Sequence, residues 1–260
     1  MGRLQDRVAI VTGGGRGIGR AIAELFASEG AKVVVATLSP EPGQAAVDTI
    51  RAAGGEAILV SLDMGDRGSV KAMVDKAAEA LGGIDIVVHN AAYIPFGTID
   101  QLSDEALDKT FDVGVKACFW LTKDALPYLK RSKAGRILVT SSVAGLTSAI
   151  IGMSHYSSVK SAVHGFVRGA GLELAPYGIT VNAVAPGLTN SDQLRRSASP
   201  DAIKLMSKHI PLGRPAEPIE QAHGFLYLAS DEAAYVTGTV LTIDGGSLLG
   251  NPAGIELDQV

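Results

Sequence analysis

The chain has little of what several classes of protein require. Its 260 residues include one cysteine, Cys118, so no disulfide can form within the chain, which suits a reducing compartment. Cys118 is interpreted as a small buried apolar side chain. The formal net charge of −4 leaves no basic excess, whereas nucleic acids and anionic membranes both attract basic surface patches. We therefore expect neither as a partner.

Long apolar runs are also missing. No run reaches the roughly 18 residues of a membrane-spanning helix, and the first residues lack the apolar segment of a signal peptide. The histidines show no metal-ligand spacing with cysteine or acidic residues, so we predict no metal site. Together these absences predict a cytoplasmic protein.

Glycine and short β-branched runs are abundant, and the runs alternate with helical patterns. Strands are predicted at 8–11, 32–36, 57–61, 84–89, 136–140, 179–184 and 240–243. Helices are predicted at 18–28, 41–53, 69–81, 104–130 and 219–229, with another that carries Tyr156 and ends near Pro176. This alternation predicts an α/β fold, a single domain over residues 1–260 with a doubly wound parallel sheet and helices on both faces. The tail from Gly250 to Val260 is expected to be loose or to form an oligomer contact.

Tyr156 and Lys160 are four residues apart, which places them one turn apart on one helix face. A neighbouring ammonium favours the phenolate, so we expect Lys160 to lower the pKa of Tyr156. Tyr156 then suits general acid/base catalysis on a hydroxyl. Ser142, fourteen residues earlier, is a hydrogen-bond donor for the same substrate oxygen.

A glycine-rich turn, Thr12 to Gly19, follows the first predicted strand and opens the first helix. In this position glycines let the backbone approach a pyrophosphate, and the helix N-terminus supplies free N–H groups. The second strand ends Ala36-Thr37-Leu38-Ser39, without the acid that would hydrogen-bond the ribose of NAD. Hydroxyl donors there, with Arg16 in the turn, favour NADP(H) over NAD(H).

These motifs together resemble the short-chain dehydrogenase/reductase family over essentially the whole chain. The matching residues are Thr12 to Gly19, Asp63, Asn90-Ala-Ala, Ser142, Tyr156-x-x-x-Lys160, Asn182 and Asp244-Gly-Gly. The resemblance implies a seven-stranded Rossmann sheet, a homotetramer, and Ser142, Tyr156 and Lys160 as catalytic residues. The implied cofactor-binding residues are Gly13, Arg16, Gly17, Ile18, Gly19, Thr37, Leu38, Asp63, Met64, Asn90, Ala91, Tyr156, Lys160, Pro186, Gly187, Leu188 and Thr189.

Two features depart from the family pattern. Ser142 lies one residue further from Tyr156 than is usual, which leaves Ser141 as an alternative. Gly114 stands where the family usually has an Asn that holds a water in a proton relay from the Lys to solvent. We hypothesise that Gly114 slows this relay without abolishing hydride transfer; the alternatives are a natural variant whose helix bends differently and an engineered substitution.

The predicted function is NADP(H)-dependent interconversion of a ketone and a secondary alcohol. Apolar residues dominate the three segments expected to enclose the substrate: 93–96, 146–153 and a lid at 188–212 that contains Arg195 and Arg196. A hydrophobic small molecule is therefore favoured. Two alternatives stay open: a 3-oxoacyl-(carrier protein) reductase, and a nucleotide-binding sensor or scaffold with low turnover. His89 and His155, beside Asn90 and Tyr156, are interpreted as ordinary hydrogen-bonded residues.

Overall fold

The computed structural model describes residues 2–250, and the predicted tail contact at 251–260 lies outside that range. Seven parallel strands form one sheet in the order β3-β2-β1-β4-β5-β6-β7. The strands are β1 Val8–Thr12, β2 Lys32–Thr37, β3 Glu56–Ser61, β4 Ile86–His89, β5 Arg136–Thr140, β6 Thr180–Pro186 and β7 Val240–Ile243. The predicted doubly wound Rossmann fold is confirmed.

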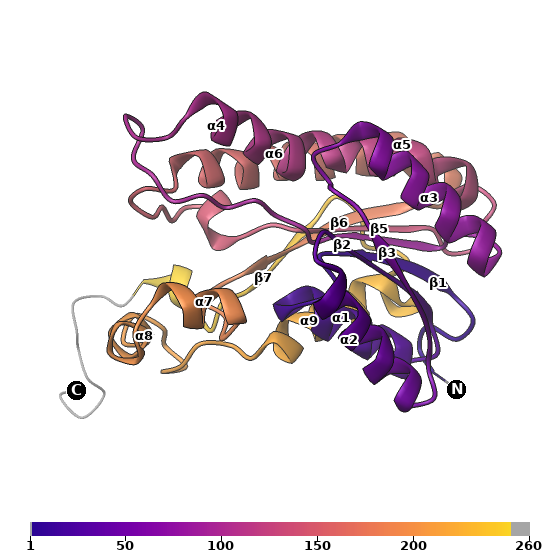
Figure 1. Ribbon diagram of the computed structural model, residues 1–260, viewed down its shortest axis with the longest axis horizontal. Helices are drawn as coiled ribbons and strands as arrows, with labels where there is room; N and C mark the ends of the chain where they lie inside the picture. The colour runs from indigo at the N-terminus through magenta and orange to yellow at the C-terminus, as the bar shows by residue number, and fades with distance from the viewer. Residues whose placement is uncertain (1, 251–260) are drawn as a thin grey trace.

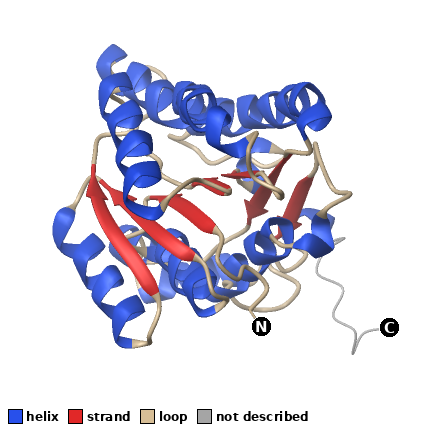
Figure 2. Ribbon diagram, turned by 90° about the vertical axis from the view of Figure 1, so that its right-hand side faces the viewer, coloured by secondary structure: helices blue, strands red, loops and turns tan. Residues whose placement is uncertain are grey.

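Helices cover both faces of the sheet (Figures 1 and 2). One face carries α1 Gly17–Ser28, α2 Pro40–Ala52 and α9 Pro218–Ala229. The other carries α3 Arg67–Leu81, α4 Asp104–Phe111, α5 Ala117–Leu129 and α6 Ser154–Leu174. Two short helices, α7 Asp192–Ser197 and α8 Pro200–Ser207, lie together beside one end of the sheet (Figure 1).

The strands are apolar throughout because both sides of the sheet are buried. Successive residues of β1 show this: Ala9 and Val11 pack in a core with Phe26 of α1, whereas Ile10 packs in the opposite core with Leu121 of α5. The alternation follows from the two-residue period of a strand. In residues 2–250, no helix combines the length and hydropathy needed to span a membrane.

The helix predicted over 104–130 is interrupted. A π-helical segment, Asp112–Lys116, separates α4 from α5, and Gly114 is buried at its centre. A Cβ atom on Gly114 would lie 2.3 Å from Cγ1 of Val159 in α6. The break therefore occurs where the backbone approaches α6 too closely for a side chain. Such π-bulges are frequent at functional sites.

The strand order reverses between β1 and β4, which are neighbours in the sheet. Chains leaving these two strands turn to opposite faces, so a crevice opens at their carboxyl ends. Both the glycine-rich turn after β1 and Asn90 after β4 stand at this crevice.

Candidate active site

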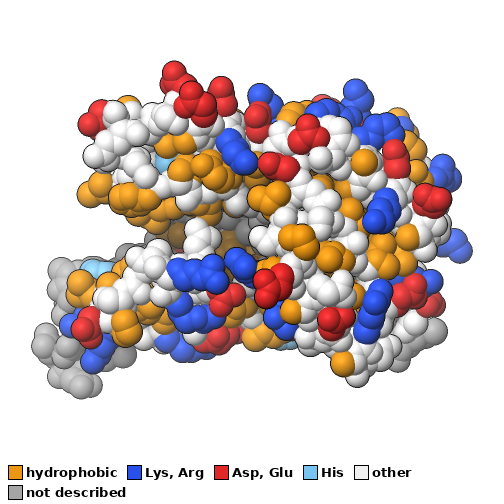
Figure 3. Space-filling view, in the orientation of Figure 1, with side chains coloured by type: hydrophobic (Ala, Val, Ile, Leu, Met, Phe, Trp, Pro, Cys, Tyr) orange, Lys and Arg blue, Asp and Glu red, His pale blue; other side chains and the backbone are white. Residues whose placement is uncertain are grey.

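A cavity of about 590 Å³ occupies the crevice. In the space-filling view it opens into the deep hollow above α7 and α8, with apolar side chains along its upper rim (Figure 3). It brings together nine of the residues predicted from the sequence: Gly13, Arg16, Gly17, Ile18, Thr37, Asn90, Ala91, Tyr156 and Lys160. Residues far apart in the chain thus form one site.

The glycine-rich turn is shaped to receive a phosphate. Gly13 and Gly17 have φ values of +67° and +52°, which side-chain-bearing residues rarely adopt. A Cβ on Gly13 would lie 2.9 Å from Nδ2 of Asn90, so the side chain would block the cleft floor. The N-terminus of α1 has no side-chain cap and no acid in its first turn. Its first N–H groups and the helix dipole therefore remain available to an anion.

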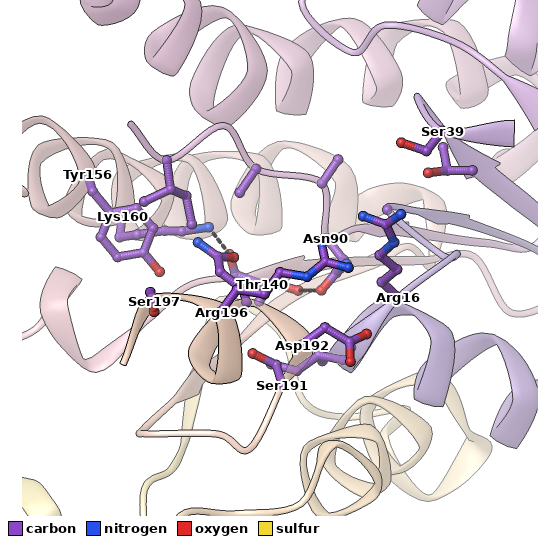
Figure 4. A pocket seen from close by; sticks show the side chains of 18 residues that line it. Arg16, Ser39, Asn90, Thr140, Tyr156, Lys160, Ser191, Asp192, Arg196 and Ser197 are labelled. Atoms are coloured by element: carbon purple, nitrogen blue, oxygen red, sulfur yellow. Dashed lines mark hydrogen bonds between the residues drawn. The ribbon is translucent and has the colours of Figure 1, made fainter. Parts of the chain in front are cut away.

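A chain of hydrogen bonds forms the floor of the cavity. The hydroxyl of Thr12 accepts from the backbone N–H groups of Asn90 (3.0 Å) and Ala91 (3.1 Å). The Asn90 amide donates to the Thr12 carbonyl (3.1 Å) and accepts from the hydroxyl of Thr140 (3.0 Å). Lys160 Nζ donates to the Thr140 carbonyl at 2.6 Å (Figure 4). The carboxyl ends of β1, β4 and β5 thereby hold the ammonium in place.

Burial dominates the electrostatics of Tyr156 and Lys160. It lowers the pKa of Lys160 to about 8 because the low-dielectric interior disfavours the charged amine. Burial likewise raises the pKa of Tyr156, while the adjacent Ser142 hydroxyl acts in the opposite direction. The net direction is therefore upward, opposite to the lowering expected from the spacing, because burial outweighs the effects that favour the phenolate. The ammonium is bonded to Thr140 and lies 5.5 Å from the centre of the Tyr156 ring.

Ser141 and Ser142 have different hydrogen-bond partners in the structure. The Ser141 hydroxyl is buried, lies 2.6 Å from Nε2 of His164 and donates to the Lys160 carbonyl at 3.4 Å. Ser142 Oγ accepts a hydrogen bond from the Ala144 backbone at 3.1 Å, and its hydroxyl also acts on the adjacent Tyr156, whose pKa it lowers. Of the two serines, Ser142 is the one beside Tyr156 that can donate to a ligand.

His89 is fully bonded inside the fold. Its Nε2 lies 2.9 Å from the carbonyl of Val113, beside Gly114, and its Nδ1 lies 3.2 Å from the Thr12 hydroxyl. A carbonyl can only accept, so the proton is assigned to Nε2. Burial, with the nearby charge of Lys160, lowers the pKa of His89 to about 4, and the ring is neutral.

His155 and Cys118 are also internal. Nε2 of His155 bonds to the carbonyl of Pro95 at 3.0 Å, which ties α6 to the loop after β4. Cys118 is a free, buried thiol that donates to the Gly114 carbonyl. Burial raises the pKa of this thiol to about 12, in agreement with its interpretation as a small apolar residue.

Several predicted residues lie outside the set that lines the cavity. Leu38 is 64% exposed, whereas Met64 is buried in the core. Asp63 bonds to the backbone of Gly65 and pairs with Lys109. The remaining residues of this kind are Gly19, Ser142, Pro186, Gly187, Leu188 and Thr189.

Most of the other residues that line the cavity had no motif to reveal them. Thr140 ends β5, and its position at a strand terminus beside Ser142 is the one available signal. Ala92 is the last residue of the Asn90-Ala-Ala motif but is not among the predicted cofactor-binding residues, and α7 adds an inner wall formed by Ser191, Asp192, Gln193 and Ser197. The placement of that wall depends on tertiary packing.

Comparison with known proteins identifies the family. A family profile described as enoyl-(acyl carrier protein) reductase matches residues 13–247. An uncharacterized oxidoreductase of Thermotoga maritima is 40% identical over 94% of this chain and 98% of its own. A 2,5-dichloro-2,5-cyclohexadiene-1,4-diol dehydrogenase of Sphingobium indicum is 39% identical over 95% and 98%.

A solved structure agrees with this assignment. A short-chain dehydrogenase from Burkholderia cenocepacia, in complex with NADP, superimposes with a TM-score of 0.89 and 36% identity, over 95% of this chain and 99% of that one. The sequence motifs, the sheet order and these matches agree. The chain belongs to the short-chain dehydrogenase/reductase family of oxidoreductases.

Proposed function

We propose that the protein is an NADP(H)-dependent oxidoreductase that interconverts a ketone and a secondary alcohol, with Tyr156 as the general acid/base. One observation carries the proposal: Tyr156 and Lys160 line the same cavity as Gly13 and Gly17 of the phosphate-binding turn. A proton donor and a turn suited to bind a dinucleotide thus line one cavity. When bound, the nicotinamide supplies or accepts the hydride.

The raised pKa of Tyr156 suits the reduction direction. The phenol is protonated at neutral pH and can donate to the oxygen of a ketone as negative charge develops there. The ammonium of Lys160 then stabilises the resulting phenolate. Ser142, beside Tyr156, can direct its hydroxyl proton to the same oxygen when a ketone is bound, so its role would be to orient and polarise the carbonyl.

NADP(H) is favoured by the chemistry at the end of β2. Arg16, Thr37 and Ser39 line this part of the cavity together, and all three can donate to a 2′-phosphate. No carboxylate stands between Ala36 and Ser39 to repel that phosphate. The NADP complex of the structural relative supports the same preference.

A hydrophobic substrate is favoured by the exposed apolar side chains of the segments predicted to enclose it. Phe96 and Ile151 are 77% and 87% exposed, and Leu205 of α8 is 60% exposed. All three belong to the segments predicted to enclose the substrate, and Ile94 from the same loop lines the cavity itself. We take residues 188–212 as the lid over this opening. Assembly into a homotetramer in the cytoplasm stays a prediction from the family.

The experiment is a panel assay of NADPH oxidation with aryl ketones, cyclic diketones and 3-oxoacyl thioesters. We expect turnover of the apolar ketones, slower turnover with NADH, and loss of activity in Tyr156→Phe. A preference for the carrier-bound thioester would instead support the 3-oxoacyl reductase. Binding of NADPH without turnover of any compound would support the sensor.

A further inference from the structure

Helix α7 presents two consecutive arginines in different ways. Arg195 donates to the carbonyl and side chain of Asn190 at 2.8 and 2.9 Å, and to the Asp192 carboxylate at 2.7 Å. It borders a second hollow, on the outer side of α7, with Glu217. Arg196 instead lines the main cavity with Gln193 and Ser197, which share one face of the helix.

No hydrogen bond or ion pair joins the Arg196 guanidinium to any residue between 2 and 250. Arg16, at the far end of the cavity, is likewise without a side-chain partner in residues 2–250, whereas the remaining charged groups are engaged. Asp192 is the one acid among the described lining residues, and Arg195 neutralises it. Lys160 is bonded to the Thr140 carbonyl. Arg196 is therefore an exposed cation that lines the cavity and has no counter-charge among the described residues.

The position of Arg196 along the cavity indicates which anion it would bind. In Figure 4 Arg196 reaches from α7 into the stretch between Arg16 at one end and Tyr156 at the other, near Asn90. The glycine-rich turn borders this stretch: a Cβ on Gly17 would lie 3.4 Å from Cβ of Ser191, the N-cap of α7. The middle of the cavity thus has the N-terminus of α1 on one wall and Arg196 on the other.

We propose that Arg196 binds the diphosphate of the dinucleotide, so that α7 holds the cofactor against the glycine-rich turn. The inference rests on the proposed function, because it requires a dinucleotide in this cavity. The dipole of α1 offers about half a positive charge, which leaves most of the charge of a diphosphate unmatched. A guanidinium opposite the turn supplies a full charge and two parallel N–H donors.

The test is direct binding, measured by titration calorimetry with NADPH, NADH and adenosine 2′,5′-bisphosphate. The first two contain the whole diphosphate, and the third has the 2′-phosphate with only the adenosine-side phosphate of the diphosphate. We expect Arg196→Leu to raise the Kd of NADPH and NADH by the same factor, roughly ten- to a hundredfold, and to raise the Kd of the bisphosphate by clearly less. Lys204→Leu is the control: it removes an exposed cation of α8 that lies outside the set lining the cavity, and it should leave all three unchanged. Arg196→Lys keeps the positive charge but lacks the two parallel N–H donors of the guanidinium. Its Kd values for the dinucleotides should lie between those of the wild-type protein and of Arg196→Leu.

The opposite results overturn the inference. If Arg196→Leu leaves the Kd values of NADPH and NADH unchanged, Arg196 does not bind the diphosphate. A rise only in the KM of a carboxylate-bearing ketone would assign Arg196 to the substrate instead. An equal loss for the bisphosphate would assign Arg196 to the adenosine end. Arg16→Leu tests the proposed NADP(H) preference separately, because it should weaken NADPH and the bisphosphate but not NADH. If the wild-type protein binds no dinucleotide, both proposals fall.

Discussion

A Cβ atom on Gly114 would lie 2.3 Å from Cγ1 of Val159. Val159 is buried in α6, directly before Lys160 and one turn after His155 and Tyr156. The missing side chain at position 114 therefore sets how closely α6 approaches the π-helical segment. The same contact gives a physical reason for glycine at the position where the family resemblance leads us to expect Asn.

Gly114→Ala should reduce stability, because the new methyl group must displace a β-branched side chain that has few alternative rotamers. We expect a loss of about 1–3 kcal/mol in the free energy of unfolding, measured in urea. Gly165→Ala in α6 is the control: no described atom beyond its chain neighbours and its own helix lies within 4 Å of that Cβ. It should stabilise by about 1 kcal/mol. Equal effects at the two positions would contradict the packing argument.

The proton-relay hypothesis needs a background in which Asn fits. We expect Val159→Ala to open space, so that adding Gly114→Asn raises kcat compared with Val159→Ala alone. The increase should be measured across pH, since a relay that supplies Lys160 with protons depends on the charge of its amine. A kcat that stays the same at every pH would reject the hypothesis.

The low pKa of Lys160 predicts an alkaline limb in the rate of ketone reduction. The protonated amine stabilises the phenolate that forms when Tyr156 donates its proton. This assistance is complete below the pKa of about 8 and is lost as pH rises through that value. We therefore expect kcat/KM, which reports the free enzyme, to fall above about pH 8.

Two variants check the assignment of that limb. Lys160→Met should have a lower kcat/KM and no limb near pH 8. Tyr156→Phe should lose roughly 10²–10⁴-fold at every pH, because the proton donor itself is gone. If Lys160→Met retains the limb, another group is responsible.

His89 predicts a sensitivity to acid. In the folded protein the pKa of His89 falls from an ordinary value near 6.5 to about 4. Between pH 6.5 and pH 4, His89 is therefore protonated in the unfolded chain but neutral in the folded chain, which favours unfolding. The stability from the neutral ring is complete above pH 6.5 and declines as pH falls to 4. The change corresponds to about 3 kcal/mol.

His89→Gln can still donate to the Val113 carbonyl but cannot titrate. We expect the stability difference between wild type and variant to shrink by this amount from pH 7 to pH 4 in urea unfolding. A difference that is constant with pH would show that His89 is not the group that responds.

His155 predicts an effect on the substrate side of the cavity. Its ring is the donor to Pro95, in the loop that also contributes Tyr93, Ile94 and Phe96. Loss of one buried hydrogen bond costs about 1 kcal/mol, so His155→Leu should raise the KM for an apolar ketone about fivefold. The Kd of NADPH should stay within about twofold, and His155→Gln should restore KM. A change in the Kd of NADPH alone would contradict this role.

Much of the fold could be predicted because local signals and tertiary structure agree. Apolar runs bounded by glycines place every strand end within two residues of its observed position. The break at Gly114 could not be predicted, because the helical pattern continues through it and its cause, Val159, lies in another helix. For the same reason, only the fold shows that His164 occupies Ser141 rather than Ser142.

Some residues of the candidate site could likewise be predicted from the sequence, and others could not. Residues in motifs, such as Gly13, Asn90 and Tyr156, line the cavity as predicted. The direction of the Tyr156 pKa shift could not be read from the spacing of Tyr156 and Lys160, because spacing carries no information on burial. Gln193 and Ser197 reach the cavity through the packing of α7, for which the sequence has no motif.

The hydrogen-bonded floor from Thr12 through Asn90 and Thr140 to Lys160 has an evolutionary consequence. Thr12, Asn90 and Thr140 stand at the carboxyl ends of β1, β4 and β5, and Lys160 lies in α6. The segments at 93–96, 146–153 and 188–212 instead follow β4, β5 and β6 as loops and short helices. Mutations can accumulate in these segments without moving the ammonium. Substrate specificity can therefore change through these three segments one at a time, while the catalytic residues keep their positions. For the same reason, exchanging these segments between relatives is a way to engineer substrate specificity.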